Sequence, residues 1–303
     1  MNELDAIALR FSPASLLLLN GILALVMFGV ALDLRVADFR RVLSIGRAPA
    51  LGLTAQFFLL PALTYALVLV LEPQPSLALG MFLVAACPGG TLSNVMTHLA
   101  GGNTALSVTM SAISTLAAMV MTPLNLAFWG NLYPPTRDLL QAVALDPIDM
   151  VVTVGLLLAV PVSAGMTLAH RAPDFAARAR RPMRILSMVV FALFVVGALA
   201  ANFDYFLEFI GQVAVLVIVH NGLALATGYG LARGARLAEG DRRAVAIEVG
   251  IQNSGLGLIL IFDFFAGLGG MAIVAAWWGV WHIVSGLAVS SWWARHPAAD
   301  ADP

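Results

Sequence analysis

The sequence predicts an all-α polytopic membrane protein, and three observations carry that prediction. Of the 303 residues, 60% are hydrophobic and 11% are charged, and the mean hydropathy is +0.92. Apolar residues gather in runs that match the roughly 20 residues a helix needs to cross a bilayer. Arginines gather in alternate loops between those runs. This composition excludes a soluble fold, so the lipid bilayer surrounds most of the chain.

Apolar runs of spanning length recur along the whole sequence. Counting runs of about 17–25 residues as helices, we expect nine transmembrane helices, near 14–33, 48–71, 76–99, 103–131, 148–170, 183–203, 209–232, 241–262 and 268–293. The fourth run is long enough to tilt or to include an interfacial turn. We expect these spans to form a single transmembrane transporter domain over residues 1–303.

The charge pattern predicts an orientation. Every basic residue other than histidine is an arginine, and all of the 16 except Arg10 and Arg137 follow spans 1, 5, 7 or 9. Short cytoplasmic loops collect basic residues. We therefore expect a multi-pass protein of the cell (inner) membrane, with its N-terminus outside and its C-terminus in the cytoplasm.

Composition also excludes several classes of partner and site. The net charge of −1 argues against nucleic acid, because such binding depends on neutralising phosphates with lysine and arginine. The single cysteine, Cys87, excludes an internal disulfide and a multi-cysteine zinc site. No basic segment precedes the first apolar run, so we expect no cleaved signal peptide. No feature of the sequence indicates an obligate protein partner.

Helix-breaking residues interrupt two of the predicted spans, and these breaks organise the rest of the chain. Span 3 contains Cys87-Pro-Gly-Gly-Thr-Leu-Ser-Asn94 and span 8 contains Glu248-Val-Gly-Ile-Gln-Asn-Ser-Gly255. Proline removes a backbone donor and glycine is a poor helix former. We therefore expect breaks at Pro88, Gly89, Gly90, Gly250 and Gly255.

The two interrupted spans occupy corresponding positions in two halves of the sequence. Spans 1–4 (14–131) align with spans 6–9 (183–293), the second copy starts on the other side of the bilayer, and span 5 (148–170) has no counterpart. We therefore expect inverted repeats. Paired broken helices in inverted repeats point to a transport site near the middle of the membrane.

Glu248 is the one acidic residue well inside a predicted span. A charged group there costs at least ~2.5–3.5 kcal/mol on insertion scales, so it normally faces a cavity, a partner or an ion. Counting from Asp241 at ~1.5 Å per residue puts Glu248 roughly 10 Å into the membrane. The structural alternative is an ion pair with Arg243 at the cytoplasmic edge. The neighbouring amides of Gln252 and Asn253 favour a functional site.

Other polar residues within the spans extend this hypothesis. Thr91, Ser93 and Asn94 follow the break in span 3, and their oxygen atoms are of the kind that hard cations such as sodium would use. An ordinary proline kink is the alternative interpretation of this break. In span 4, Ser107 and Ser111 are four residues apart and share a helical face.

Four polar or small residues within the spans also have ordinary structural explanations. Serines in membrane helices more often bond a neighbouring helix or their own backbone than a ligand, which applies to Ser107 and Ser111. His282 in span 9 fits a buried histidine that a neighbour satisfies better than it fits a ligand, and Cys87 fits a small packed residue.

Six segments of the chain resemble the bile acid:sodium symporter family, in the form of a bacterial member. They run in family order across nearly the whole sequence: Met27-Phe-Gly-Val-Ala-Leu32, Ala55-Gln-Phe57, Cys87-Pro-Gly-Gly-Thr-Leu-Ser-Asn-Val95, Ala105-Leu-Ser-Val-Thr-Met110, Glu248-Val-Gly-Ile-Gln-Asn-Ser-Gly255 and Trp281-His282. The CPGGTxSN and EVGxQNSG pair is the most specific part of the resemblance.

The resemblance implies a core domain, a panel domain, and two broken helices that cross beside two sodium ions. One sodium would be held by Ser93, Asn94, Ser107, Ser111 and Glu248. The second would be held by Gln56, Glu248 and Gln252, with the backbone carbonyls of Val249 and Ile251. The organic anion of family members is contacted at positions similar to Thr91, Asn253 and His282.

The chain departs from the family pattern in a few places. Ser111 stands where relatives often have threonine, and Ile251 replaces a common methionine whose carbonyl alone would bind. Ile283 stands where asparagine is frequent, which removes one polar contact to substrate. Many bacterial members have ten spans, and the nine apolar runs lead us to expect that this chain lacks the first, as some nine-span relatives do.

Together these observations predict a sodium-coupled symporter that imports an organic anion by alternating access. The substrate class is bile acid-like, pantoate-like or a keto acid. Proton coupling at Glu248 and an exporter of a related fold are alternatives. An intramembrane hydrolase using Ser254 and His282 is another, since such dyads meet in space. The sequence contains no HExxH, GxGxxG or Walker motif, which favours a transporter over an enzyme.

Overall fold

The computed structural model describes residues 13–32, 46–90, 92–143, 146–201 and 203–296, and this part of the chain folds into helices with no strand. The predicted all-α membrane protein is thus confirmed. Helices long and apolar enough to cross a membrane cover Ala48–Leu71, Thr104–Leu132, Ile148–Arg171, Phe209–Gly234 and Gly269–Arg295. Shorter apolar helices cover Leu17–Ala31, Pro75–Ala86 and Ser254–Phe264. The count of nine spans stays a prediction.

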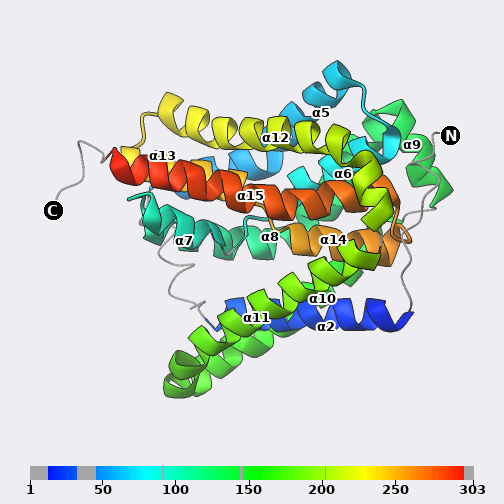
Figure 1. Ribbon diagram of the computed structural model, residues 1–303. Helices are drawn as coiled ribbons and strands as arrows, with labels where there is room; N and C mark the ends of the chain where they lie inside the picture. The colour runs from blue at the N-terminus through cyan, green and yellow to red at the C-terminus, as the bar shows by residue number, and fades with distance from the viewer. Residues whose placement is uncertain (1–12, 33–45, 91, 144–145, 202, 297–303) are drawn as a thin grey trace.

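Three helices form a group that lies along one side of the molecule (Figure 1). This group consists of α2 (Pro13–Ala31), α10 (Pro147–Arg171) and α11 (Pro173–Ala201). Gly165 of α10 lets α2 approach closely, because a Cβ there would lie 2.6 Å from Ala31 Cβ and 2.7 Å from Phe28 O. Small residues permit such approaches between membrane helices. We call these helices the three-helix group.

Most of the other described helices, long and short, form a second, larger group. It contains α4 (Ala48–Thr54), η1 (Ala55–Leu59), α5 (Leu60–Leu71), α6 (Pro75–Ala86), α7 (Leu92–Leu99), α8 (Thr104–Leu132), α12 (Phe203–Gly234), α13 (Glu239–Gly250), α14 (Ser254–Phe264) and α15 (Gly269–Arg295). Eleven residues of α6, Ser76 to Ala86, are buried, so this helix lies at the centre of the group. A helix that is apolar on all sides belongs in such a position.

The groups meet mainly where α2 packs on α14 and where α10 packs on α8. Across the first pair, Asn20 Nδ2 donates to Asp263 Oδ1 at 3.3 Å. The predicted loop after span 4 contains one element that periodicity missed, the short helix α9 (Pro134–Ala142). This helix buries only Thr136 and Leu140, so its apolar pattern is too brief to resemble a span.

Span 2 contains a short π-helical segment, η1, between α4 and α5. Leu60 N donates to Ala55 O, five residues earlier, and Pro61 follows without an N–H to donate. The wider turn accommodates the backbone where this hydrogen bond is missing. It also directs Gln56 into the buried interior, where the residue is 1% exposed. π-Helical turns are frequent at functional sites.

Candidate ion-binding site at the helix crossover

The two broken spans cross at their breaks. Span 3 is divided between α6 and α7, and span 8 between α13 and α14. Gly90 N donates to Ile251 O at 2.6 Å and Asn253 N donates to Pro88 O at 2.8 Å, forming an antiparallel bridge of Gly89 with Gln252. The unwound backbone therefore satisfies its own polar groups, as a non-helical segment at membrane depth must.

Glycine at position 89 leaves the space that the Glu248 side chain fills. A Cβ on Gly89 would lie 2.1 Å from Glu248 Oε1, and one on Gly90 would lie 3.2 Å from Gln252 O. Gly250 is the last residue of α13. Gly255, which we predicted as a helix break, lies instead in the first turn of α14, because Asn253 Oδ1 accepts from Leu256 N and caps that helix.

Oxygen atoms from two helices, α7 and α8, surround the Glu248 carboxylate. Ser93 Oγ on α7 donates to Glu248 Oε2 at 2.6 Å, and Ser111 Oγ on α8 lies 2.9 Å from both carboxylate oxygens. Ser107 Oγ lies 2.8 Å from Asn94 Oδ1 and 3.4 Å from Glu248 Oε2. Asn94 Oδ1 also accepts from Ser111 at 3.2 Å. The structure thus brings the five residues predicted for one sodium into one cluster, which we call the Glu248 cluster.

Glu248 has no cationic partner among the residues that the structure describes. Its side chain is 2% exposed, yet the ion pairs found within the described ranges do not include it. The ion pair with Arg243 that we considered is not formed, because Arg243 instead pairs with Glu239 at 3.1 Å. A buried carboxylate held only by hydroxyl groups is costly without a counter-charge.

A second cluster, of amides, lies on the other side of the crossover. Gln56 Nε2 donates to Cys87 O at 2.6 Å and to Gln252 Oε1 at 2.8 Å. Gln252 Nε2 donates to Val249 O at 2.7 Å, and Ile251 O accepts from Gly90. Gln56 Oε1 is buried and has no hydrogen-bond partner among the described residues. The residues predicted for a second sodium therefore lie together, but N–H groups occupy the carbonyl oxygens of Gln252, Val249 and Ile251. We call this the Gln56 cluster.

The helix ends give the crossover two electrostatic sides. The C-terminal ends of α6 and α13 carry partial negative charge, which favours a cation, and the N-terminal ends of α7 and α14 carry partial positive charge, which favours an anion. Glu248 is two residues from the end of α13, where the helix dipole itself disfavours a second negative charge. The local field therefore adds to the need for a cation at this carboxylate.

The structure describes two of the three predicted substrate residues. Thr91 lies outside the described residues. Asn253 caps α14 at the crossover. His282 of α15 is 5% exposed, and its Nδ1 has no partner within the described part of the chain. On the same helix, Cβ atoms at Gly279 and Gly286 would touch Ser254 and Ile251, so this part of α15 lies against the crossover.

Two residues that pattern analysis did not identify also contribute to the crossover. Thr97 Oγ1 lies 3.3 Å from Ser107 Oγ and extends the Glu248 cluster toward the C-terminal end of α7. Asn221 of α12 donates to Gly250 O at 2.8 Å and accepts from Ser285 at 2.6 Å, which anchors the broken end of α13. In the sequence, each of them could have been found only as a polar residue within an apolar run.

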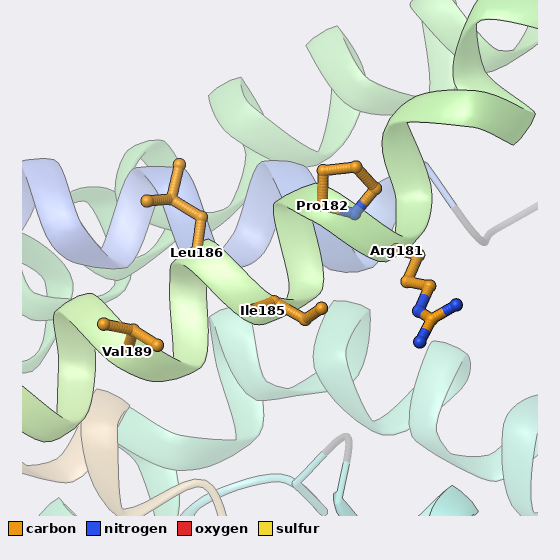
Figure 2. Close-up of a pocket in the computed structure, with 5 residues that line it drawn as sticks. All are labelled: Arg181, Pro182, Ile185, Leu186 and Val189. Carbon is orange, nitrogen blue, oxygen red and sulfur yellow. The ribbon is translucent and has the colours of Figure 1, made fainter.

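A cavity of about 560 Å³ lies along α11, apart from the crossover clusters (Figure 2). Four apolar side chains and one arginine line it: Arg181, Pro182, Ile185, Leu186 and Val189. All five residues belong to α11 in the three-helix group. None of them is a residue of the Glu248 or Gln56 cluster, so the cavity is not the candidate ion site.

Comparisons with known proteins give the family of this chain. The model of the Sodium Bile acid symporter family matches residues 21–209. An uncharacterized sodium-dependent transporter, YocS, of Bacillus subtilis is 32% identical over 273 residues, which cover 90% of this chain and 82% of that protein. The probable chloroplastic sodium/metabolite cotransporter BASS2 of Oryza sativa is 29% identical over 282 residues, covering 92% and 65%.

A mammalian relative is similar to this chain at a comparable level of identity. The human ileal sodium/bile acid cotransporter is 29% identical over 237 residues, which cover 78% of this chain and 66% of that protein. The chain thus spans about two thirds of the length of the rice and human relatives. With the helical fold and the crossed broken helices, these matches show that the chain belongs to the sodium bile acid symporter family and is a multi-pass membrane transporter rather than an enzyme.

Proposed function

We propose that this protein is a sodium-coupled symporter that imports an organic anion, and that the Glu248 cluster binds the first coupling ion. The observation that carries this proposal is the buried carboxylate of Glu248, which accepts hydrogen bonds from the hydroxyls of Ser93, Ser107 and Ser111 but has no cationic partner among the described residues. A bound cation would supply the missing counter-charge.

The chemistry of the cluster favours a hard cation such as sodium over a transition metal. Its donors are one carboxylate, one amide carbonyl and three hydroxyl oxygens, and hard cations prefer oxygen ligands of this kind. Among the described residues no three His, Cys, Asp or Glu side chains gather as a transition metal would require. Each hydroxyl has a single proton and can turn its lone pairs toward an ion. The relative in Bacillus is named as sodium-dependent, which supports the same ion.

A second sodium ion would bind in the Gln56 cluster. The candidate ligands are Gln56 Oε1, Gln252 Oε1 and the carbonyls of Val249 and Ile251, together with Glu248. Because amide N–H groups of Gln56 and Gln252 now donate to Cys87 O, Gln252 Oε1 and Val249 O, an entering ion must displace them. We infer that the second ion binds after the first and reorients the Gln56 amide.

The anionic group of the substrate would lie at the N-terminal ends of α7 and α14. These ends present partial positive charge at the crossover, beside Asn253 and His282, and Thr91 immediately precedes α7 in the sequence. Two sodium ions would also offset the negative charges of Glu248 and of a carboxylate substrate. A bile acid-like, pantoate-like or keto acid would each supply such a group.

Transport would proceed by alternating access around this crossover. The three-helix group would act as the panel and the larger group as the core, with inverted repeats over 14–131 and 183–293 and an unpaired span at 148–170. Sodium would favour the outward-exposed arrangement by binding it more tightly than the other. The N-terminus would lie outside the inner membrane and the C-terminus in the cytoplasm, as the arginine pattern predicts.

Uptake into proteoliposomes tests this function. Vesicles containing the purified protein are given labelled taurocholate, pantoate or pyruvate, with an inward sodium gradient, an inward proton gradient without sodium, or neither. We expect uptake of at least one anion with the sodium gradient only, and its loss when a sodium ionophore collapses the gradient. Uptake that follows the proton gradient without sodium would replace sodium by proton coupling at Glu248. Net export under the same gradient would contradict import.

A further inference from the structure

Arg243 is a buried arginine that lies outside the crossover and contacts the C-terminal ends of two helices. Only 4% of this residue is exposed, although the charge pattern predicts that it lies near the cytoplasmic edge of the membrane. Nη1 donates to Ala100 O at 2.8 Å and to Trp293 O at 3.2 Å, and Nη2 donates to His296 O at 2.7 Å. Arginines at a membrane edge usually extend to water. This one is enclosed by protein.

The carbonyl groups that Arg243 binds are those of two helix C-termini. Helix α7 ends at Leu99, and Gly101, with φ of +63°, closes it in a Schellman motif in which Gly101 N donates to His98 O and Gly102 N to Thr97 O. That motif leaves the carbonyl of Ala100 to Arg243. At α15, the guanidinium binds Trp293 O and His296 O and lies 5.7 Å above the Trp293 ring. Its positive charge stabilises both helix C-termini, which carry partial negative charge.

Glu239 orients the guanidinium from the same helix, α13. Arg243 Nε donates to Glu239 Oε1 at 3.1 Å, and Tyr229 of α12 donates to the same carboxylate at 3.1–3.2 Å. Nearby, Asn103 N donates to Gly240 O and Asn103 Nδ2 donates to Asp241 Oδ1, so the loop after α7 is tied to the start of α13. The guanidinium is therefore held in one orientation by several fixed groups.

These contacts connect the two half-helices that supply the Glu248 cluster. Helix α7 carries Ser93 and Asn94 at its crossover end, and α13 carries Glu248 near its own. The half-helices touch at the crossover through Ser93 and Glu248, and at the cytoplasmic end through Arg243 and Ala100. Helix α7 has only eight residues. A helix this short is unstable alone, so tertiary contacts must fix its position.

We propose that Arg243 is a positioning residue for the candidate sodium site. It fixes the cytoplasmic end of α7 against α13 and α15, and so keeps the Ser93 and Asn94 oxygens in contact with Glu248. This inference rests on the proposed function, because it assigns Arg243 a role in binding an ion at the Glu248 cluster. Arg243 itself touches neither the ion nor the carboxylate.

Sodium titration of the detergent-purified protein tests the proposal. The melting temperature is measured against sodium chloride concentration, with choline chloride keeping ionic strength constant, and the half-saturating concentration gives the apparent affinity. We expect Arg243→Ala to weaken that affinity about 10-fold or more, as the loss of groups that orient metal ligands does. Arg243→Lys keeps the charge but has fewer donors and no planar fork, so we expect an intermediate loss.

Arg242→Ala is the matched control. Arg242 is the neighbouring residue and pairs with the same Glu239 at 3.3 Å, but its side chain is 28% exposed and its other described bond is to Leu237 O. We expect its sodium affinity to equal that of the wild type. A purely structural role of Arg243 would lower the melting temperature in choline without moving the half-saturating sodium concentration.

The outcomes separate the two proposals. If the wild type responds to sodium and the Arg243→Lys and Arg243→Ala variants keep its affinity, the positioning role is wrong while the sodium site stands. Equal weakening by Arg242→Ala would also overturn it, because the effect would then belong to α13 in general. If Arg243→Ala does not fold, Arg243→Lys decides. No sodium response in the wild type would overturn the proposed function and this inference with it.

Discussion

The Glu248 cluster and the Gln56 cluster lie on either side of one crossover, but their oxygens have different neighbours. Around Glu248, the donors are serine hydroxyls, which rotate freely about their C–O bonds. Around Gln252, the donors are amide N–H groups, which are fixed to planar side chains. A hydroxyl can turn its proton away from an arriving cation, whereas an amide must move as a whole.

This difference indicates an order of binding. The Glu248 cluster has a net negative charge and oxygens already gathered, so a cation gains much and rearranges little. The Gln56 cluster is neutral apart from the shared Glu248, and its buried hydrogen bonds must break first, at about 1–3 kcal/mol for each group left unsatisfied. The buried Gln56 Oε1, which has no hydrogen-bond partner in the described part of the chain, is the atom that reorientation would bring to the ion.

The largest effect is expected from Glu248→Gln, which keeps the shape of the side chain and removes its charge. Losing one partner of a buried charge pair costs about 2–5 kcal/mol, so sodium-driven uptake should fall about 30-fold or more. Proteoliposome uptake at saturating sodium measures this. Wild-type rates in the variant would mean that the ion is held elsewhere.

Gly89→Ala should have the next largest effect, because its Cβ would enter the space of the Glu248 carboxylate. Overpacking of this kind costs about 1–3 kcal/mol, and the displaced carboxylate should bind sodium about 10-fold more weakly. Gly155→Ala on α10, where nothing lies within 4 Å, is the control. Sodium titration by thermal shift compares them, and equal affinities would show that the carboxylate does not need its present position.

Ser111→Ala should weaken sodium binding less. The variant loses one hydroxyl ligand, worth about 1 kcal/mol or roughly 5-fold in affinity, while Ser93 and Ser107 stay in the cluster. Thr109→Val on the same helix removes a buried hydroxyl that donates only to Ala105 O among the described residues. A matched loss of sodium affinity in both variants, in the same titration, would show that α8 packing rather than the hydroxyl is responsible.

Gln56→Leu should have the smallest effect on the first ion and a specific effect on the second. We expect the affinity of the first ion to change less than about twofold, because this residue and Ser111 lie in separate clusters. The curve of uptake rate against sodium concentration should become less steep. Thr54→Ala in the same span, an exposed residue, should keep it. An unchanged curve in Gln56→Leu would contradict a second ion at the amides.

The sequence was informative wherever a residue conflicted with its surroundings. Glu248, Ser93, Ser107 and Ser111 are polar residues in apolar runs, and the crossover brings them together through the glycines and proline that we predicted to break the helices. Gln56 was predicted only through the family resemblance, because a lone amide in span 2 has no pattern of its own.

Other features depend on contacts between distant parts of the chain. Arg243 lies in an arginine-rich loop pattern that predicts exposure to the cytoplasm, but its acceptors at Ala100, Trp293 and His296 are set by how three helix ends meet. The restart of α14 at Ser254, which places Gly255 inside a helix, depends on the cap that Asn253 forms. Local propensity at a glycine predicts the opposite.

Thermal stability in sodium against potassium chloride, at equal ionic strength, tests the central claim most directly. Ligand binding to the folded state raises stability by about 2.7 kcal/mol at a ligand concentration of 100 times Kd. We predict a sodium-specific rise in the melting temperature of the wild type and none in Glu248→Ala. An equal sodium-specific rise in Glu248→Ala, or no rise in the wild type, would contradict a sodium ion at this carboxylate.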